Sequence, residues 1–303
     1  MNQVADRIPT KRITIRAGKF GMSDFFDNNT YSKDPRTQFF NWSLWANGAW
    51  DYPADTRGYT YGVVAELVKP TWSLRLSSVA VPRIANFHLL EYNLSKAHSE
   101  TVEVDHKFSL INQPGKVRFT VSNTYSQAPS YSEGLKALRN NNIFLLNVIQ
   151  GNEEHKVYGG RKVSLGLNVE QQINNELGFF SRAGWNDGKY VTWAFTEIDR
   201  TINAGFSVKG IKWKRPDDVF GVAAAINGIS KEHREFLKSG GYGFIIGDGT
   251  LNYGNEGILE TYYRAQLGAM FSITFDYEFV NHPAYNKDRG PVNAFGIRGH
   301  VQF

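Results

Sequence analysis

Tryptophans and charged side chains that could bind a small solute gather near the beginning of the chain. Three tryptophans fall within residues 22–59, and arginine and glutamate residues stand in that segment or in the stretches beside it. Aromatic ring faces stack on the apolar C–H faces of cyclic polyols, while guanidinium and carboxylate groups hydrogen-bond to hydroxyls. The candidate contact residues are Arg16, Arg36, Trp42, Trp45, Trp50, Glu66 and Arg75. Together they predict a site for an uncharged, hydroxyl-rich molecule.

A structural role is the alternative for each of these residues. Aromatic side chains more often fill space between elements than contact a ligand, so the tryptophans would then only hold their segment against the fold. The charged residues would form cross-strand ion pairs, each contributing less than about 1 kcal/mol. Arg16, Glu66 and Arg75 are the stronger candidates for solute contact, because they adjoin the tryptophan-rich segment.

Other chemistries lack the residues that they need. The chain has no cysteine, and its seven histidines do not show metal-ligand spacing. The stretch "EHREF" is not the zinc motif H-E-x-x-H, no G-x-S-x-G occurs, and "GDGTLNYGNEG" lacks the acidic spacing of a calcium loop. The net charge of +5 is scattered rather than clustered. We therefore expect no enzyme activity, metal, cofactor or nucleic-acid partner.

Strands must position the candidate residues, because apolar and polar side chains alternate along most of the chain. In "RITIRAGKF", Ile13 and Ile15 lie on the face opposite to Thr14 and Arg16, and similar stretches recur up to "AFGIRGHVQF". About twelve such strands can be counted, and the connections between them alternate between long and short with one exception. No apolar run approaches the roughly 18 residues of a membrane-spanning helix.

This pattern predicts an all-β fold: a transmembrane antiparallel β-barrel of the bacterial outer-membrane type, forming one domain over residues 1–303. The apolar face would meet lipid and the polar face would line a water-filled lumen. A soluble antiparallel sandwich with one solvated face is the alternative. The stretch "SKEHREFLKSGG" combines a serine cap with a terminal Gly-Gly and predicts a short helix in a long loop.

Two segments have special roles in such a barrel. Residues 22–59 are too rich in aromatics to remain in solvent, so we expect this loop to fold inward and to narrow the pore. At the other end of the chain, the alternation of the last strand continues to Phe303. A terminal aromatic in this setting resembles the signal that outer-membrane barrels present to their assembly machinery.

Three long stretches resemble the carbohydrate-selective porin family (OprB-like), from about residue 12 to the end of the chain. They are "FFDNNTYSKDPRTQFFNWSLWANGAWDYPADTRGYTYG", "SGGYGFIIGDGTLNYGNEGILETYY" and "FVNHPAYNKDRGPVNAFGIRGHVQF". Members of that family are roughly sixteen-stranded outer-membrane barrels that pass sugars by diffusion. The resemblance implies that about four N-terminal strands and an export signal lie outside this sequence. A closed barrel of about twelve strands is the second possibility.

The resemblance also implies a location in the bacterial outer membrane, with small sugars, outer-membrane lipid and the barrel-assembly machinery as partners. The expected function is passive, carbohydrate-selective diffusion of small sugars. A lumen lined by both signs of charge suits a neutral solute better than an ion. A general or ion-preferring porin, a polysaccharide-export barrel and a soluble sugar-binding β protein are the alternatives.

Overall fold

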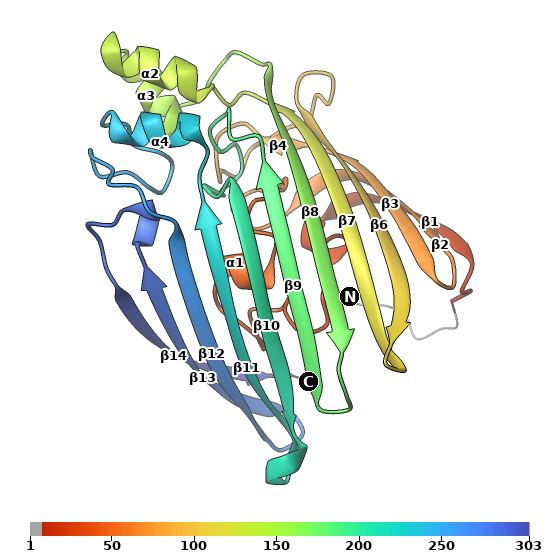
Figure 1. Ribbon diagram of the computed structural model, residues 1–303. Coiled ribbons are helices and arrows are strands. Elements are labelled where there is room, and N and C mark those ends of the chain that lie inside the picture. The colour runs from red at the N-terminus through yellow and green to blue at the C-terminus, as the bar shows by residue number, and fades with distance from the viewer. Residues whose placement is uncertain (1–7, 303) are drawn as a thin grey trace.

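The computed structural model describes residues 8–302, and Phe303, the expected assembly signal, lies outside the described residues. Twelve strands form one antiparallel sheet in which neighbours along the chain are neighbours in space (Figure 1). The predicted all-β fold is confirmed. The strands are β1 (Arg12–Phe20), β2 (Thr60–Val68), β3 (Trp72–Val79), β6 (His98–Leu110), β7 (Gln113–Ser126), β8 (Gly160–Gln172), β9 (Leu177–Asn186), β10 (Arg200–Gly210), β11 (Arg215–Gly228), β12 (Glu256–Leu267), β13 (Phe271–Asn281) and β14 (Val292–Val301).

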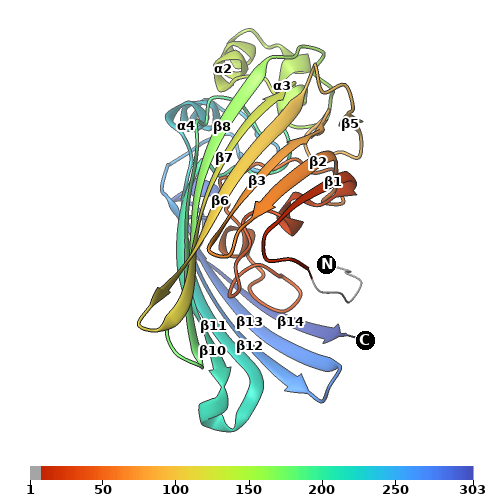
Figure 2. The ribbon, with the colours of Figure 1, turned by 90° about the vertical axis from the view of Figure 1, so that its right-hand side faces the viewer.

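The sheet curves into a trough whose two edges are β1 and β14 (Figure 2). Within residues 8–302, β1 pairs with β2 alone and β14 pairs with β13 alone. The possibility of a closed twelve-strand barrel is therefore wrong for this part of the chain, since the first and last strands share no register.

Apolar side chains cover the convex face of the sheet. On β1, Ile13 is 73% exposed and Ile15 is 68% exposed, whereas Thr14 between them and Arg16 after them are partly covered. At the opposite edge, Phe295 is 82% exposed and Ile297 is 73% exposed. So much exposed apolar surface suits contact with lipid rather than water.

The segment between β1 and β2, residues 22–59, lies against the concave face of the sheet (Figure 2). We call it the inward loop. It contains the 3-10 turn η1 (Met22–Asp24) and the short helix α1 (Trp42–Trp45). Its aromatic side chains pack against Val64 on β2 and Val79 on β3. The concave face of the sheet is therefore apolar, rather than polar, where the loop contacts it.

Helices and long connections close over one end of the trough (Figure 1). They are α2 (Tyr131–Arg139), α3 (Ile143–Ile149), α4 (Lys231–Lys238), the turn η3 (Pro283–Tyr285) and the small pair β4 (Val81–Pro82) and β5 (Leu90–Glu91). The opposite end has short turns, one of which contains η2 (Ile211–Trp213). None of the helices in residues 8–302 is long and apolar enough to cross a membrane.

Helix α4 confirms the helix predicted from "SKEHREFLKSGG", with Ser230 accepting the backbone N–H of His233 as its cap. Helices α2 and α3 lie in the connection between β7 and β8, where the alternation of long and short connections predicts only a long loop. Their starting signal is Ser130 followed by Glu133, which form a capping box at the first turn of α2.

Candidate functional site

A buried arginine of β9 fixes the inward loop to the wall. Arg182 is 1% exposed, and its Nε lies 3.0 Å from both carboxylate oxygens of Asp27. The same guanidinium donates to the carbonyl oxygens of Ser32 at 2.7 Å and Leu44 at 3.1 Å. Because a guanidinium presents several donors in one plane, a single side chain holds separate points of the folded loop. Neither Arg182 nor Asp27 is among the residues that the sequence predicts.

A second anchor joins the inward loop to residues 187–199, which connect β9 to β10. Asp51 is buried and accepts the backbone N–H groups of Trp193 at 3.2 Å, Phe195 at 3.0 Å and Thr196 at 3.2 Å. The Nζ of Lys162 on β8 lies 3.4 Å from the same carboxylate. One buried carboxylate therefore sets the position of Phe195 relative to the inward loop.

Glycines in β9 leave room for the loop to lie this close. A Cβ at Gly184 would stand 1.9 Å from Oδ1 of Asn47, and one at Gly178 would stand 2.0 Å from the ring of Tyr31. Any side chain at these two positions would push the loop away from the wall. The same glycines explain why β9 shows a weaker alternation than its neighbours.

Trp42 and Trp45 lie on α1 with their rings partly exposed. Their ring centroids are 4.8 Å apart at nearly a right angle, and the ring centroid of Phe195 lies 4.9 Å from that of Trp42. A cavity of about 440 Å³ opens beside Trp42 and Phe195. Its lining also offers amide and carboxylate groups, from Asn41, Asn227 and Glu256. The site thus combines ring faces with hydrogen-bonding groups.

Trp50 does not belong to this exposed surface. It is 3% exposed, and its ring packs against Phe26 at 6.0 Å and Tyr52 at 5.2 Å between centroids. The expectation that Trp50 offers a stacking surface is therefore wrong, because the folded loop encloses its ring.

The predicted charged residues of β1, β2 and β3 meet in one row. Glu66 lies 3.9 Å from Arg16 and 2.8 Å from Arg75, and Arg75 also reaches Glu103 on β6 at 2.8 Å. Side-chain exposure falls from 37% for Arg16 to 14% for Arg75 and 11% for Glu66. Glu66 and Arg75 are thus largely committed to ion pairs, whereas Arg16 keeps accessible donors and lies over the ring of Phe25.

Arg36 stands apart from both groups. Its guanidinium forms a fork with the carboxylate of Asp34 at 2.8 and 2.9 Å, and its side chain is 75% exposed. Within residues 8–302 it makes no ion pair with the charged row, so the structure does not join it to the other predicted residues.

The family follows from comparison with known proteins. The family model described as "Carbohydrate-selective porin, OprB family" matches residues 6–303. The chain belongs to the OprB family of carbohydrate-selective porins. A search of curated protein sequences finds no match.

Solved porins share the fold of this OprB-family chain. The high-pH structure of OprB from Pseudomonas putida superposes with a TM-score of 0.69 at 15% identity, covering 95% of this chain and 68% of that one. The outer membrane channel DcaP of Acinetobacter baumannii gives 0.55 at 9% identity, with coverages of 95% and 71%. The low-pH structure of the P. putida protein gives 0.52 at 12% identity, and there this chain spans 62% of the solved chain. Family and fold together make the chain an outer-membrane porin and confirm the resemblance found in the sequence.

The porin also has a pH-sensitive anchor beneath α4. Asp199, just before β10, accepts from the backbone N–H of Ser230 at 2.8 Å and lies 3.1 Å from Nδ1 of His233. Burial alone would raise the pKa of Asp199, but the contacts with His233 and Ser230 outweigh burial and lower that pKa below its ordinary value of 3.8. A carboxylate with a lowered pKa stabilises the fold above its ordinary pKa, and the contribution is lost as the pH falls through the lowered value.

We expect Asp199→Asn to lower the melting temperature of the porin at neutral pH, because the amide replaces an ionised acceptor of Ser230 and His233. The difference from the unchanged protein should persist down to about pH 4 and shrink below it. Melting followed by circular dichroism across this range measures the effect. A difference that stays constant at about pH 3 would contradict the assignment.

Proposed function

We propose that the inward loop is the selectivity constriction of the pore, and that small sugars pass it by stacking on Trp42, Trp45 and Phe195. The observation that carries the proposal is the position of these rings. Trp42 and Trp45 are partly exposed on the inward loop, which buried Arg182 and Asp51 hold in place, and Phe195 is partly exposed on residues 187–199. Trp42 and Phe195 also line a cavity with polar groups. A pinned loop keeps the opening narrow, while exposed rings replace the water lost from the apolar faces of a sugar.

Arg16 is the proposed polar partner among the charged residues of the row. Its side chain is the most exposed of the three predicted there, so a hydroxyl can reach it without breaking the shorter Arg75–Glu66 pair. Glu66 and Arg75 then orient Arg16 and balance its charge. A balanced row does not select ions by sign, which favours a neutral solute over the general or ion-preferring alternative.

Binding at the constriction has to be weak, since a solute that binds tightly does not leave the pore. Millimolar affinity, about −4 kcal/mol, is the right scale for such a filter. The proposal gives the chain a passive role without catalysis. Outer-membrane lipid would contact the convex apolar face, and the barrel-assembly machinery would act on the C-terminal strand.

The proposal is tested by Trp45→Ala in the porin reconstituted in a planar bilayer. We expect glucose to block ion current partially, and the variant to weaken that block about tenfold, which corresponds to roughly 1.4 kcal/mol. Arg75→Ala should have a comparable effect, because Arg16 and Glu66 lose their neighbour. The matched control is Trp72→Ala, which removes a tryptophan that is 38% exposed from β3. Equal block in the Trp45 and Trp72 variants would contradict a sugar contact at α1.

A further inference from the structure

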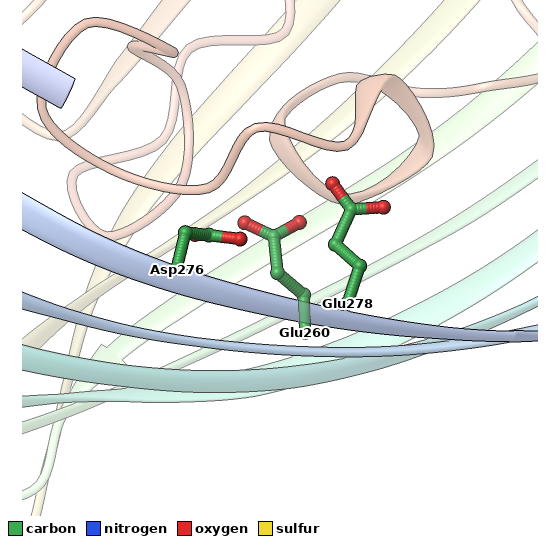
Figure 3. Close-up of side chains that lie close together, drawn as sticks. All are labelled: Glu260, Asp276 and Glu278. Carbon is green, nitrogen blue, oxygen red and sulfur yellow. The ribbon is translucent and has the colours of Figure 1, made fainter. Parts of the chain in front are cut away.

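Three carboxylates stand together on the inner face of β12 and β13, under the inward loop (Figure 3). Glu260 and Glu278 are direct register partners, and Asp276 lies two positions along the same face of β13. One oxygen atom of each residue lies within 4.8 Å of those of the other two. Glu260 is fully buried and Asp276 is 6% exposed, so this group is not a set of solvated surface acids.

Among residues 8–302, no lysine, arginine or histidine forms an ion pair with this group. The ion pairs of residues 8–302 include Glu66, Glu170 and other wall carboxylates, but none involves Glu260, Asp276 or Glu278. Arg298 on β14 is the charged neighbour, yet it donates to the carbonyl oxygens of Pro35 and Gln38 and lies over the ring of Phe40. Two of its nitrogen atoms therefore serve the inward loop, and its Nε has no partner within residues 8–302. If all three carboxylates were ionised, one guanidinium would leave a formal excess of negative charge.

A second observation indicates a missing partner. Oδ2 of Asp276 is fully enclosed and has no hydrogen-bond partner within residues 8–302. Figure 3 shows the carboxylate of Asp276 directed at that of Glu260. An enclosed carboxylate oxygen without a donor loses its hydration and gains nothing in return, which is unfavourable unless a ligand occupies the space in front of it.

We propose that Glu260, Asp276 and Glu278 bind a divalent cation, and that calcium is the preferred ion. Calcium takes oxygen ligands at about 2.4 Å, so two ligands of one ion can be no more than about 4.8 Å apart. The mutual distances in this cluster meet that limit. Calcium tolerates irregular geometry and completes its shell with water, whereas magnesium demands a near-ideal octahedron, which three carboxylates on two neighbouring strands do not provide.

The ion site is coupled to the inward loop. Glu260 accepts the backbone N–H groups of Phe40 at 2.6 Å and Asn41 at 2.9 Å, and Glu278 accepts from the side-chain amide of Asn41 at 3.1 Å. Asn41 is the cap of α1, which carries Trp42 and Trp45. A cation that holds the carboxylates in place would thus fix the start of α1 and the tryptophans with it. Fixing the start of α1 goes beyond the proposed function. The cation site itself does not depend on the proposed function.

The test is calorimetric titration of calcium chloride into the porin, purified in detergent and freed of metal with a chelator. We expect a saturable site at neutral pH, and Asp276→Asn should weaken calcium binding at least tenfold. Glu278→Gln should do the same if the first variant fails to fold. The matched control is Asp217→Asn, which changes an exposed acid at the start of β11 and should leave calcium affinity unchanged. Magnesium chloride should bind more weakly than calcium in every folded variant.

Two results would overturn the proposal. If the unchanged porin shows no saturable calcium binding, bound protons rather than a cation neutralise the cluster. If both cluster variants bind calcium like the control, the ion sits elsewhere, for example on co-purified lipid. Neither measurement uses sugar, so the outcome of the calcium titration does not depend on whether the proposed sugar contact exists.

Discussion

Replacing Arg182 by methionine is expected to release the inward loop, raise single-channel conductance and abolish preferential block by glucose. Methionine fills much of the same space but donates to neither the Asp27 carboxylate nor the carbonyl oxygens of Ser32 and Leu44. Asp27 would remain buried without its cation, and breaking one side of a buried pair costs roughly 3–5 kcal/mol. The loop can avoid this cost by leaving the wall, which widens the pore.

The control for this variant is Arg161→Met, which removes an exposed arginine at the outer end of β8 whose side chain bonds Asn123. It should leave conductance and glucose block unchanged. Arg182→Lys keeps the charge but lacks the planar donor set, so an intermediate conductance is expected. If Arg182→Met conducts and responds to glucose like the unchanged porin, the buried arginine does not hold the constriction.

Asp51→Asn is expected to have the next largest effect, because this carboxylate holds residues 187–199 against the inward loop. The backbone N–H of Trp193 donates to Oδ2 of Asp51, and those of Phe195 and Thr196 donate to Oδ1, so an amide can accept from only one of these two sets. The substitution also leaves Lys162 without its anion. Loss of a buried, charge-assisted network of this kind costs at least about 3 kcal/mol. Phe195 should then separate from Trp42, and glucose block should weaken at least tenfold.

A second substitution separates the two causes of this loss. In Asp51→Asn combined with Lys162→Met, no uncompensated lysine remains, so part of the lost thermal stability should return. The glucose block should stay weak, because the asparagine amide still cannot accept from all three backbone donors of residues 187–199. Full recovery of block in the double variant would show that Lys162, rather than the position of Phe195, controls the site.

The sheet could be predicted from the sequence because apolar and polar residues alternate along each strand, and this alternation shows which side chains face outward. Ile13 and Ile15 face outward and Arg16 faces inward by counting alone, and the same counting gives Phe295 and Ile297 at the other edge. It also places Arg16, Glu66 and Arg75 on neighbouring strands, where the structure finds them in one row. Helix α4 could be predicted for a similar reason, because its capping residues are local signals in the sequence.

The anchors of the inward loop could not be predicted, because they join residues that are far apart in the sequence. Arg182 follows Asp27 by 155 residues, and no local sequence pattern around either residue predicts that the two form a pair. The fate of each tryptophan depends on the same long-range fit. Trp50 and Trp45 look alike in the sequence, but the path of the loop encloses the first and leaves the second partly open. The glycines of β9 that admit the loop were the available signal.

Single-channel conductance of the unchanged porin during titration with glucose decides whether the inward loop forms a sugar-selective constriction. We expect a partial block that saturates in the millimolar range and exceeds the block by a neutral polymer of the same hydrodynamic size. A block by glucose no greater than that by the polymer would show that the loop does not select sugars and would favour a general-diffusion pore.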